Sequence, residues 1–296
     1  MRLTRDAILA RIDAHPLGDA PAEMRTAFAA LIRGADIPLP DGAHVEMRAD
    51  GSARVTGDGS GPEIVWLHGG GYVFGSSETH SAPAAALEGC RVVVPDYRLA
   101  PEHPWPAPLE DARAVLDALG PVPVVGDSAG GHLALLLAQG GGVTRLGLIS
   151  PNTDRSGESA TRVANSARDL MNDDAADTRL WRMAMPGVAP DDPAASPLLA
   201  VRAAGGPPSE GRASPDLGLP PVWITASTDE VLLDDSLLLV RALGRAGVPV
   251  TARIETGLMH MWTLWPDLLP QARATLAELA QWLRAPVAGT GRGETG

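Results

Sequence analysis

The sequence contains no lysine, so all 24 of its basic residues are arginines, and they stand against 36 acidic residues in a chain of 296. The formal net charge is −12, and no stretch of the chain concentrates arginine. An acidic surface without a basic cluster disfavours binding to nucleic acid or to an anionic membrane surface. We therefore expect neither a nucleic acid nor a membrane as a partner.

Cysteine and long apolar runs are also scarce. Cys90 is the single cysteine, which excludes an internal disulfide, and its place before an apolar stretch predicts a small buried thiol. No apolar run approaches the roughly 20 residues of a membrane-spanning helix. Charged residues such as Arg2, Arg5 and Asp6 interrupt any signal-peptide core, so we expect a cytoplasmic protein. No cluster of cysteine and histidine offers a metal site, and we expect no cofactor.

Short apolar stretches alternate with helical patterns over most of the chain. The predicted strands cover residues 64–67, 91–95, 122–125, 146–149, 222–225 and 250–254. The predicted helices cover residues 108–119, 132–139, 234–246 and 270–283. Such alternation predicts an α/β fold with a mostly parallel sheet that helices cover on both faces. Pro121 and Pro123 are unexpected at a central strand, so we expect proline only at the first residues of the strand, which leaves Val124 and Val125 to pair.

The alternation breaks at both ends of the chain and after residue 151. Residues 1–45 carry two helical patterns and are expected to form peripheral helices. Residues 46–284 then form one α/β domain with an insertion at about 152–220, which is long for a loop and is expected to be a lid or partly disordered. Within that insertion, residues 203–215 have little to bury and are expected to be mobile. The tail at 285–296 is expected to be disordered.

Ser128 lies in the segment Gly126-Asp127-Ser128-Ala129-Gly130, which fits the pattern Gly-x-Ser-x-Gly. A predicted strand precedes the segment and a predicted helix follows it. In that setting the serine occupies a sharp, strained turn, and the glycines let strand and helix approach closely. Its hydroxyl then stands at a helix N-terminus, where free N–H groups favour a developing anion. The segment predicts a nucleophilic serine and disfavours a glycine-rich turn with an incidental serine.

A second glycine run, His68-Gly69-Gly70-Gly71, follows the predicted strand at 64–67. Acyl transfer develops negative charge on a carbonyl oxygen, which requires preorganised hydrogen-bond donors. The donors that we expect are the N–H groups of Gly70, Gly71 and Ala129. A phosphate-binding loop is disfavoured, because no Gly-Lys-Ser/Thr follows. His68 is expected to hold the loop rather than to act as a base.

These segments together resemble the hormone-sensitive-lipase-like branch of the α/β-hydrolases, the bacterial carboxylesterases. The resemblance covers roughly residues 64–283 and implies an eight-stranded sheet with a small helical cap. Residues 1–45 and the insertion at about 152–220 would build this cap on a catalytic domain at 46–284. The shared motifs are His68-Gly69-Gly70-Gly71-Tyr72, Asp96-Tyr97-Arg98-Leu99-Ala100-Pro101-Glu102, Pro104, Pro106, Glu110-Asp111 and Gly126-Asp127-Ser128-Ala129-Gly130-Gly131.

The remaining members of a catalytic triad follow the nucleophile in the order acid, then histidine. Asp229 comes just after the predicted strand at 222–225, where the family's acid would lie. Asp234 and Asp235 are rivals that we place on the next helix, and Glu230 is a rival that we expect to point elsewhere. His260 follows the last predicted strand and resembles the family's catalytic histidine. We therefore predict Ser128, Asp229 and His260 as the triad.

Four side chains are candidates for contact with substrate. Tyr72 and Phe74 flank the expected oxyanion loop, whereas Trp181 and Met185 come from the insertion and could equally form the core of the cap. Asp96 and its charged neighbours could suggest a second acid–base site. We interpret them instead as a structural network of ion pairs and turns beside the oxyanion loop.

The leading function is hydrolysis of small or short-acyl carboxylic esters, with a small-molecule ester as the partner. The same triad would serve a deacetylase, another acyl hydrolase or an acyltransferase that acts on a specialised metabolite. A non-catalytic receptor of the same fold, as in the plant gibberellin receptors, need not keep the full triad and is disfavoured. A homodimer that pairs through the strand at 250–254 or its neighbouring helix is compatible with the sequence.

Overall fold

A computed structural model of the chain describes residues 2–33, 44–48, 53–57, 61–206, 217–266 and 268–286. The side chains of residues 2–5 are outside this description. Most of the segment at 203–215 and of the tail at 285–296 lies outside the described residues, so the predictions made for these two segments concern residues that the structure does not describe.

One sheet of eight strands forms the centre of the described part of the chain, in the order β1-β2-β4-β3-β5-β6-β7-β8. β2 runs antiparallel to its neighbours β1 and β4, and the other neighbouring pairs are parallel. The eight-stranded, mostly parallel sheet is therefore confirmed. The strands are β1 (His44–Met47), β2 (Ala53–Gly57), β3 (Glu63–Leu67), β4 (Arg91–Pro95), β5 (Val122–Asp127), β6 (Val143–Ile149), β7 (Val222–Ser227) and β8 (Val250–Glu255).

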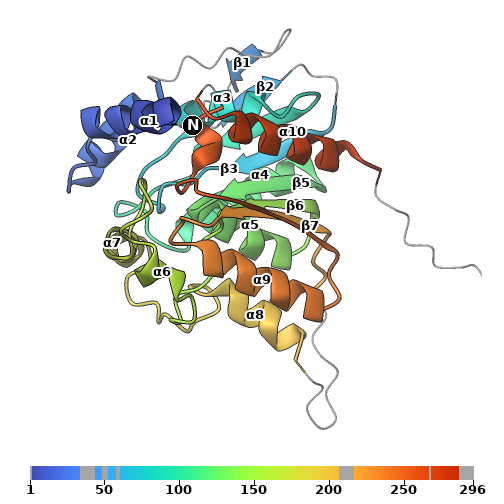
Figure 1. Ribbon diagram of the computed structural model, residues 1–296. Coiled ribbons are helices and arrows are strands. Elements are labelled where there is room, and N and C mark those ends of the chain that lie inside the picture. The colour runs from blue at the N-terminus through green and yellow to red at the C-terminus, as the bar shows by residue number, and fades with distance from the viewer. Residues whose placement is uncertain are drawn as a thin grey trace, which may run out of the picture.

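Helices cover both faces of this sheet (Figure 1). The helices are α1 (Arg2–Ala14), α2 (Pro21–Arg33), α3 (Ser77–Ala85), α4 (Ala107–Leu119), α5 (Ala129–Gln139), α6 (Thr161–Ala164), α7 (Asp174–Ala184), α8 (Pro197–Ala204), α9 (Leu233–Arg245), the 3₁₀ turn η1 (Trp262–Leu264) and α10 (Pro270–Arg284). α3 and α10 pack on one face, and α4, α5 and α9 pack on the other.

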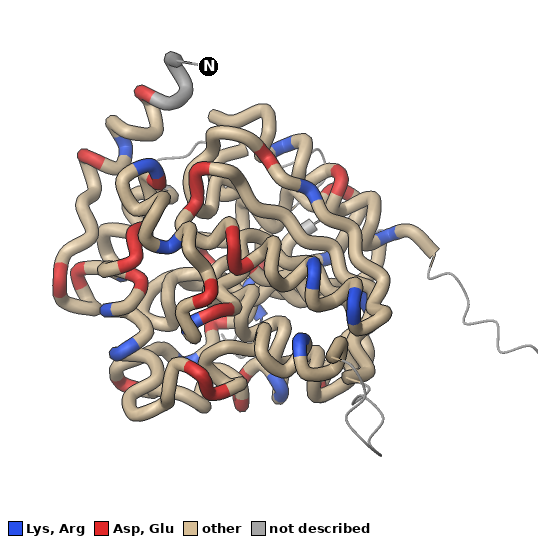
Figure 2. Tube along the Cα trace, turned by 60° about the horizontal axis from the view of Figure 1, so that its bottom comes forward, with Lys and Arg blue, Asp and Glu red and all other residues tan. Residues whose placement is uncertain are grey.

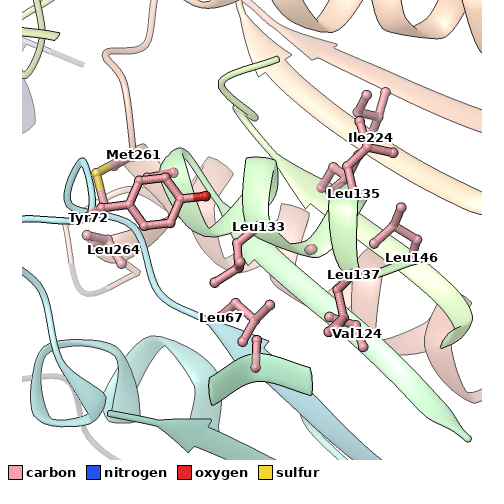
Figure 3. Close-up of a cluster of buried hydrophobic side chains, with 14 of the residues drawn as sticks. Leu67, Tyr72, Val124, Leu133, Leu135, Leu137, Leu146, Ile224, Met261 and Leu264 are labelled. Atoms are coloured by element: carbon pink, nitrogen blue, oxygen red, sulfur yellow. The ribbon is translucent and has the colours of Figure 1, made fainter. Parts of the chain in front are cut away.

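The two faces have separate cores because successive side chains of a strand point to opposite faces. Val124 of β5 belongs to the cluster that α5 covers, whereas its neighbour Val125 belongs to the cluster under α10. In Figure 3, Leu133 and Leu137 of α5 lie against the strands that carry Leu67 and Val124. α5 is thus fixed on the sheet, together with the serine that precedes it.

Pro123 lies inside β5, although proline is disfavoured in a central strand. The pairing of β5 with β6 shifts its register between Val122 and Val124, and β5 pairs with β3 only from Val124 onward. A bulge is one of the few positions where a strand tolerates proline, because no ladder hydrogen bond is needed there. Val124 and Val125 pair with both neighbouring strands, as expected, and the pairing with β6 also includes Val122, Gly126 and Asp127.

Charged residues do not gather into one basic region of the described chain. Figure 2 shows the arginines on several separate segments of the trace, with acidic residues on many of the others. Many arginines are held in ion pairs, as Arg25 is with Glu102 and Arg98 is with Glu110 and Asp111. Within the described residues, no helix has both the length and the apolar character needed to cross a bilayer.

Candidate active site

Ser128 lies in the turn between β5 and α5, as the sequence predicts. Its backbone has φ 52° and ψ −119°, a strained conformation for a residue with a side chain. The two flanking glycines are required by close contacts. A Cβ on Gly126 would lie 2.2 Å from the carbonyl oxygen of Gly130, and one on Gly130 would lie 1.9 Å from that of Leu67. The sharp turn leaves the serine only 6% exposed at the start of α5.

The structure places His260 beside Ser128, with its Nε2 2.8 Å from the serine Oγ. The opposite ring nitrogen, Nδ1, lies 2.9 Å from Oε2 of Glu230. Asp229 does not take this position, because its carboxylate accepts a hydrogen bond from the Thr228 hydroxyl at 3.5 Å. The sequence prediction of Asp229 as the partner of His260 is therefore wrong, and Glu230 is that partner.

A tight turn after β7 explains the difference between these adjacent residues. The N–H of Glu230 donates to the carbonyl of Ser227 at 3.2 Å, and the carboxylate of Glu230 accepts from the N–H of Ser227 at 2.7 Å. The Glu230 side chain therefore folds back under the end of the strand, where it is fully buried beside His260. Asp229, one residue earlier in the turn, is only half-buried. The side chain of glutamate is long enough to make both contacts.

The charge on His260 is set by opposing effects. Burial alone would lower the pKa of its imidazole, but the hydrogen bond and the charge of Glu230, with a further contribution from Asp169, raise the pKa above its usual range. Burial raises the pKa of the Glu230 carboxyl, and His260 partly offsets that effect. Since an ionised carboxylate can only accept, Nδ1 of His260 carries the proton, and Nε2 presents its lone pair to Ser128.

The glycine run lies against the nucleophile. Gly70 and Gly71 line the same cavity as Ser128 and His260, and both have positive φ, at 115° and 60°. Among the described residues, no acceptor takes a hydrogen bond from the N–H of Gly70, Gly71 or Ala129. These three groups are therefore available to a ligand, as the oxyanion prediction requires.

Asp127, the residue before Ser128 in the serine motif, binds the glycine run at Gly69. Its fully buried carboxylate accepts from Gly69 N–H at 3.1 Å and from Trp66 Nε1–H at 2.7 Å, and it lies 3.2 Å from Nε2 of His80. Burial would raise the pKa of the Asp127 carboxyl, but His80 and the hydrogen bonds hold it below its usual range. The motif alone does not indicate this role, although Asp127 stands inside it.

The residues assigned to a structural network have structural contacts. His68 stacks on Tyr97 with ring centroids 4.1 Å apart, and its Nδ1 lies 2.9 Å from the carbonyl of Gly69. The Tyr97 hydroxyl donates to the carbonyl of His68 at 2.5 Å. Asp96 accepts from the N–H and the hydroxyl of Ser77, both at 2.6 Å. His68 therefore holds the loop, and His260 is the histidine beside Ser128.

Two small cavities lie beside the serine turn, and Ser128 lines the first whereas its neighbour Ala129 lines the second. The first, of about 60 Å³, contains Ser128 and His260 and is lined by residues from α1–α2 and from the segment that follows α6. The candidate Phe74 is among the lining residues of this first cavity, with Leu17, Met24, Phe28, Met171, Leu180 and Met261. Residues from both the N-terminal segment and the insertion therefore line this cavity, and Figure 1 shows α1–α2 and α6–α7 on the same side of the molecule.

The second cavity, of about 20 Å³, lies beside Gly71 and Ala129 and does not include His260. Three of the four substrate candidates line it, namely Tyr72, Trp181 and Met185. The Tyr72 hydroxyl lies 2.6 Å from Nδ1 of His132, whose pKa burial lowers to about 3, so this imidazole is neutral and accepts the hydrogen bond. Among the described residues, no group of three or more His, Cys, Asp or Glu is arranged to hold a metal ion.

Comparison with known proteins places this geometry among hydrolases. A sequence model of a family described as having the α/β-hydrolase fold matches residues 64–264. An acetyl-hydrolase from Streptomyces hygroscopicus is 33% identical over 241 residues, which cover 76% of each chain. The carboxylesterase NlhH from Mycobacterium tuberculosis is 31% identical over 246 residues, which cover 76% of this chain and 74% of the relative.

Solved structures of esterases superimpose on almost the whole length of this chain. An esterase from the bacterial hormone-sensitive lipase family superimposes with a TM-score of 0.82 at 28% identity, covering 95% of this chain and 97% of the other. The esterase EstE5, in crystals soaked with p-nitrophenyl butyrate, superimposes with a TM-score of 0.77 at 29% identity, covering 96% of each chain.

Proposed function

Because the chain belongs to the α/β-hydrolase family, within the branch that resembles hormone-sensitive lipase, we propose that it hydrolyses small carboxylic esters through an acyl-enzyme on Ser128. The observation that carries the proposal is the chain of contacts from Ser128 Oγ to His260 Nε2 and from His260 Nδ1 to Glu230. Relatives named acetyl-hydrolase and carboxylesterase support the same reaction class.

In the proposed mechanism, His260 Nε2 takes the proton of the Ser128 hydroxyl as its oxygen attacks the ester carbonyl. Glu230 accepts the hydrogen bond from Nδ1–H, fixes the tautomer and stabilises the imidazolium that forms. The amides of Gly70, Gly71 and Ala129 hold the developing oxyanion. His260 then protonates the leaving alkoxide as the carbonyl–oxygen bond breaks, and the same residue activates a water molecule to release the acid.

The two cavities suggest how the ester is oriented. The leaving oxygen must lie beside His260, which protonates it, so the alcohol part would occupy the cavity that contains His260. The acyl part would then point past Gly71 and Ala129 into the cavity beside Trp181. A volume of about 20 Å³ accommodates roughly one water-sized group, which favours acetyl over longer acyl chains.

A substrate series with a nucleophile control tests the proposal. Purified protein is assayed on p-nitrophenyl acetate, butyrate and octanoate beside Ser128→Ala. We expect kcat/KM to be highest for acetate and to fall on the order of 10⁴-fold or more in Ser128→Ala. A wild-type rate equal to that of Ser128→Ala on every ester would exclude ester hydrolysis at this site.

The relative named acetyl-hydrolase also favours a second candidate, the removal of an acetyl group from a larger metabolite. Incubation with a panel of O- and N-acetylated compounds, read by mass spectrometry, separates the two candidates. Release of acetate from one compound with a far higher kcat/KM than from p-nitrophenyl acetate would identify a deacetylase. The appearance of acyl groups on an added alcohol would identify an acyltransferase.

We further propose that the protein acts in the cytoplasm and that two copies can pair through β8. β8 is an edge strand, and Ile254 on it is 38% exposed, which favours pairing between edges. Cell fractionation tests the location. Sedimentation of the wild type and of Ile254→Lys tests the pairing, and the substitution is expected to leave a monomer.

A further inference from the structure

Asp169 connects three segments of the chain that meet beside His260 and Glu230. It lies between α6 and α7 and is 8% exposed. Its Oδ1 accepts hydrogen bonds from the N–H of His260 at 2.9 Å and from the N–H of Met171 at 3.1 Å. Its Oδ2 accepts from the N–H of Val231 at 3.1 Å. One carboxylate thus contacts the histidine loop, the residue after Glu230 and the wall of the cavity that contains Ser128.

The turn that carries Asp169 also contacts the Glu230 loop through a second side chain, that of Asn165. Nδ2 of Asn165 donates to the carbonyl of Glu230 at 2.8 Å and to that of Thr228 at 3.1 Å. The N–H of Asp169 in turn donates to the carbonyl of Asn165 at 2.9 Å, so the two side chains project from one closed turn. This turn therefore provides hydrogen-bond partners for the N–H of Val231 and for the carbonyls of Thr228 and Glu230.

The loop that carries His260 needs such support. Met261, the next residue, has φ 59° and ψ 27°, a conformation that residues with side chains rarely adopt and that surrounding contacts must maintain. The hydrogen bond that the His260 N–H donates to Asp169 fixes the backbone of His260 directly before this strained residue. Among the described residues, that carboxylate is the acceptor for the His260 N–H.

We propose that Asp169 is a positioning residue, which keeps His260 and Glu230 aligned with Ser128 and ties that alignment to the cavity wall at Met171. The proposal rests on the proposed ester hydrolysis. Displacements of about 1 Å in a catalytic group can lower a rate by about 100-fold. Loss of Asp169 should therefore reduce kcat more than it changes KM.

Asp169 also acts on His260 through its charge. The groups that face the imidazole are Glu230 from the turn after β7, Ser128 at the start of α5, Asp169 and Asp177 of α7. The charge of Asp177 is balanced by ion pairs to Arg155 at 2.7 Å and to Arg162 at 2.5 Å. Removing the charge of Asp169 should therefore lower the pKa of His260.

Asp154 provides a matched control in the same insertion. It is fully buried, and it also accepts backbone hydrogen bonds, from Ser156 at 3.0 Å and from Glu158 and Ser159 at 2.9 Å. All of these donors belong to its own segment. Asp154→Asn should therefore affect stability in the way that Asp169→Asn does, without displacing His260 or Glu230.

The experiment compares full-length wild type, Asp169→Asn, Asp169→Glu and Asp154→Asn, each checked for folding by circular dichroism. We expect Asp169→Asn to lower kcat by about 10- to 100-fold, to change KM less than about threefold and to move the acidic limb of kcat/KM to lower pH. Asp169→Glu keeps the charge, so it should lower kcat and leave the limb in place. If Asp169→Asn does not fold, the kcat of Asp169→Glu decides the question.

A readout without substrate separates this proposal from ester hydrolysis itself. The titration of the His260 ring, followed by NMR, should have a lower midpoint in Asp169→Asn than in Asp154→Asn. The shift would support the positioning role even if the wild type hydrolysed none of the esters. A kcat within about twofold of that of Asp154→Asn, together with an unchanged titration midpoint, would overturn the role.

Discussion

The carboxylate of Glu230 lies 2.9 Å from Nδ1 of His260, whereas Asp229 turns away toward Thr228. Two acidic residues that are adjacent in sequence thus occupy different environments, one fully buried and one half-buried. The turn after β7 causes this difference. Its fourth residue, Glu230, folds back under the end of the strand, whereas its third residue, Asp229, faces outward.

Glu230→Gln and Asp229→Asn should therefore have very different effects on activity. A glutamine cannot stabilise the imidazolium and can favour the wrong tautomer of His260. We expect Glu230→Gln to lower kcat on the order of 10⁴-fold, as replacement of the acid does in other triads. Asp229→Asn should change kcat less than about threefold. The measurement is steady-state hydrolysis of p-nitrophenyl acetate by both variants.

Folding controls are needed for this comparison, because Glu230 is buried and also accepts a hydrogen bond from Ser227. Urea unfolding of each variant shows whether the protein assayed is native. If Asp229→Asn lost activity as severely as Glu230→Gln while both remained folded, the assignment of the acid to Glu230 would be refuted.

The acidic limb of the pH profile should report His260. The base must be neutral to accept the serine proton, so kcat/KM falls as the pH drops through the pKa of His260. Because that pKa is raised, the half-maximal rate should lie above pH 6.5. In Glu230→Gln the residual activity should have its limb at lower pH. Hydrolysis is followed at a wavelength where p-nitrophenol and its anion absorb equally, and a wild-type limb below pH 6.5 contradicts the prediction.

The strands that carry the site could be predicted because each is a short apolar run that ends at a turn. The strand predicted at 91–95 matches β4, and the one at 222–225 lies within β7. The serine and the histidine followed from motif and chain order. β1 and β2 cannot be predicted individually, because His44–Met47 and Ala53–Gly57 lack a continuous apolar run.

The acid and its support could not be predicted in the same way. The geometry of the turn at Ser227 decides which of Asp229 and Glu230 faces His260. This geometry cannot be predicted from a run of polar residues alone. Asp169 lies 91 residues from His260 in sequence, in a segment without strand or helix periodicity. Contacts of this kind arise from the tertiary fold, so only the structure reveals them.

Trp181→Ala should broaden the acyl preference. The indole lines the cavity of about 20 Å³ beside Gly71 and Ala129, so its removal makes room for several methylene groups. We expect the ratio of kcat/KM for p-nitrophenyl octanoate to that for the acetate to rise at least about tenfold, since each methylene accommodated contributes up to a few kcal/mol. Val163→Ala, at a side chain that is 75% exposed, is the matched control. An unchanged ratio would place the acyl group elsewhere.

His132 should make the protein sensitive to acid through its burial. Its pKa is about 3 in the folded protein, against 6.5 for the free side chain, because burial disfavours the charged ring. Below pH 6.5 the unfolded chain binds a proton that the folded chain does not, so stability falls as the pH falls toward 3. Between pH 7 and pH 5 this difference amounts to about 2 kcal/mol in the free energy of unfolding.

Urea unfolding at pH 7 and pH 5 isolates this contribution when wild type is compared with His132→Asn. In the wild type, the Tyr72 hydroxyl lies 2.6 Å from Nδ1 of His132. The side-chain oxygen of an asparagine at this position can still accept from that hydroxyl, but the asparagine side chain does not titrate. The variant should lose less stability than the wild type over this interval, by about 2 kcal/mol. His103→Asn, at an exposed histidine, should lose as much as the wild type does. Equal losses in all three proteins would mean that His132 is protonated in the folded state already at pH 5.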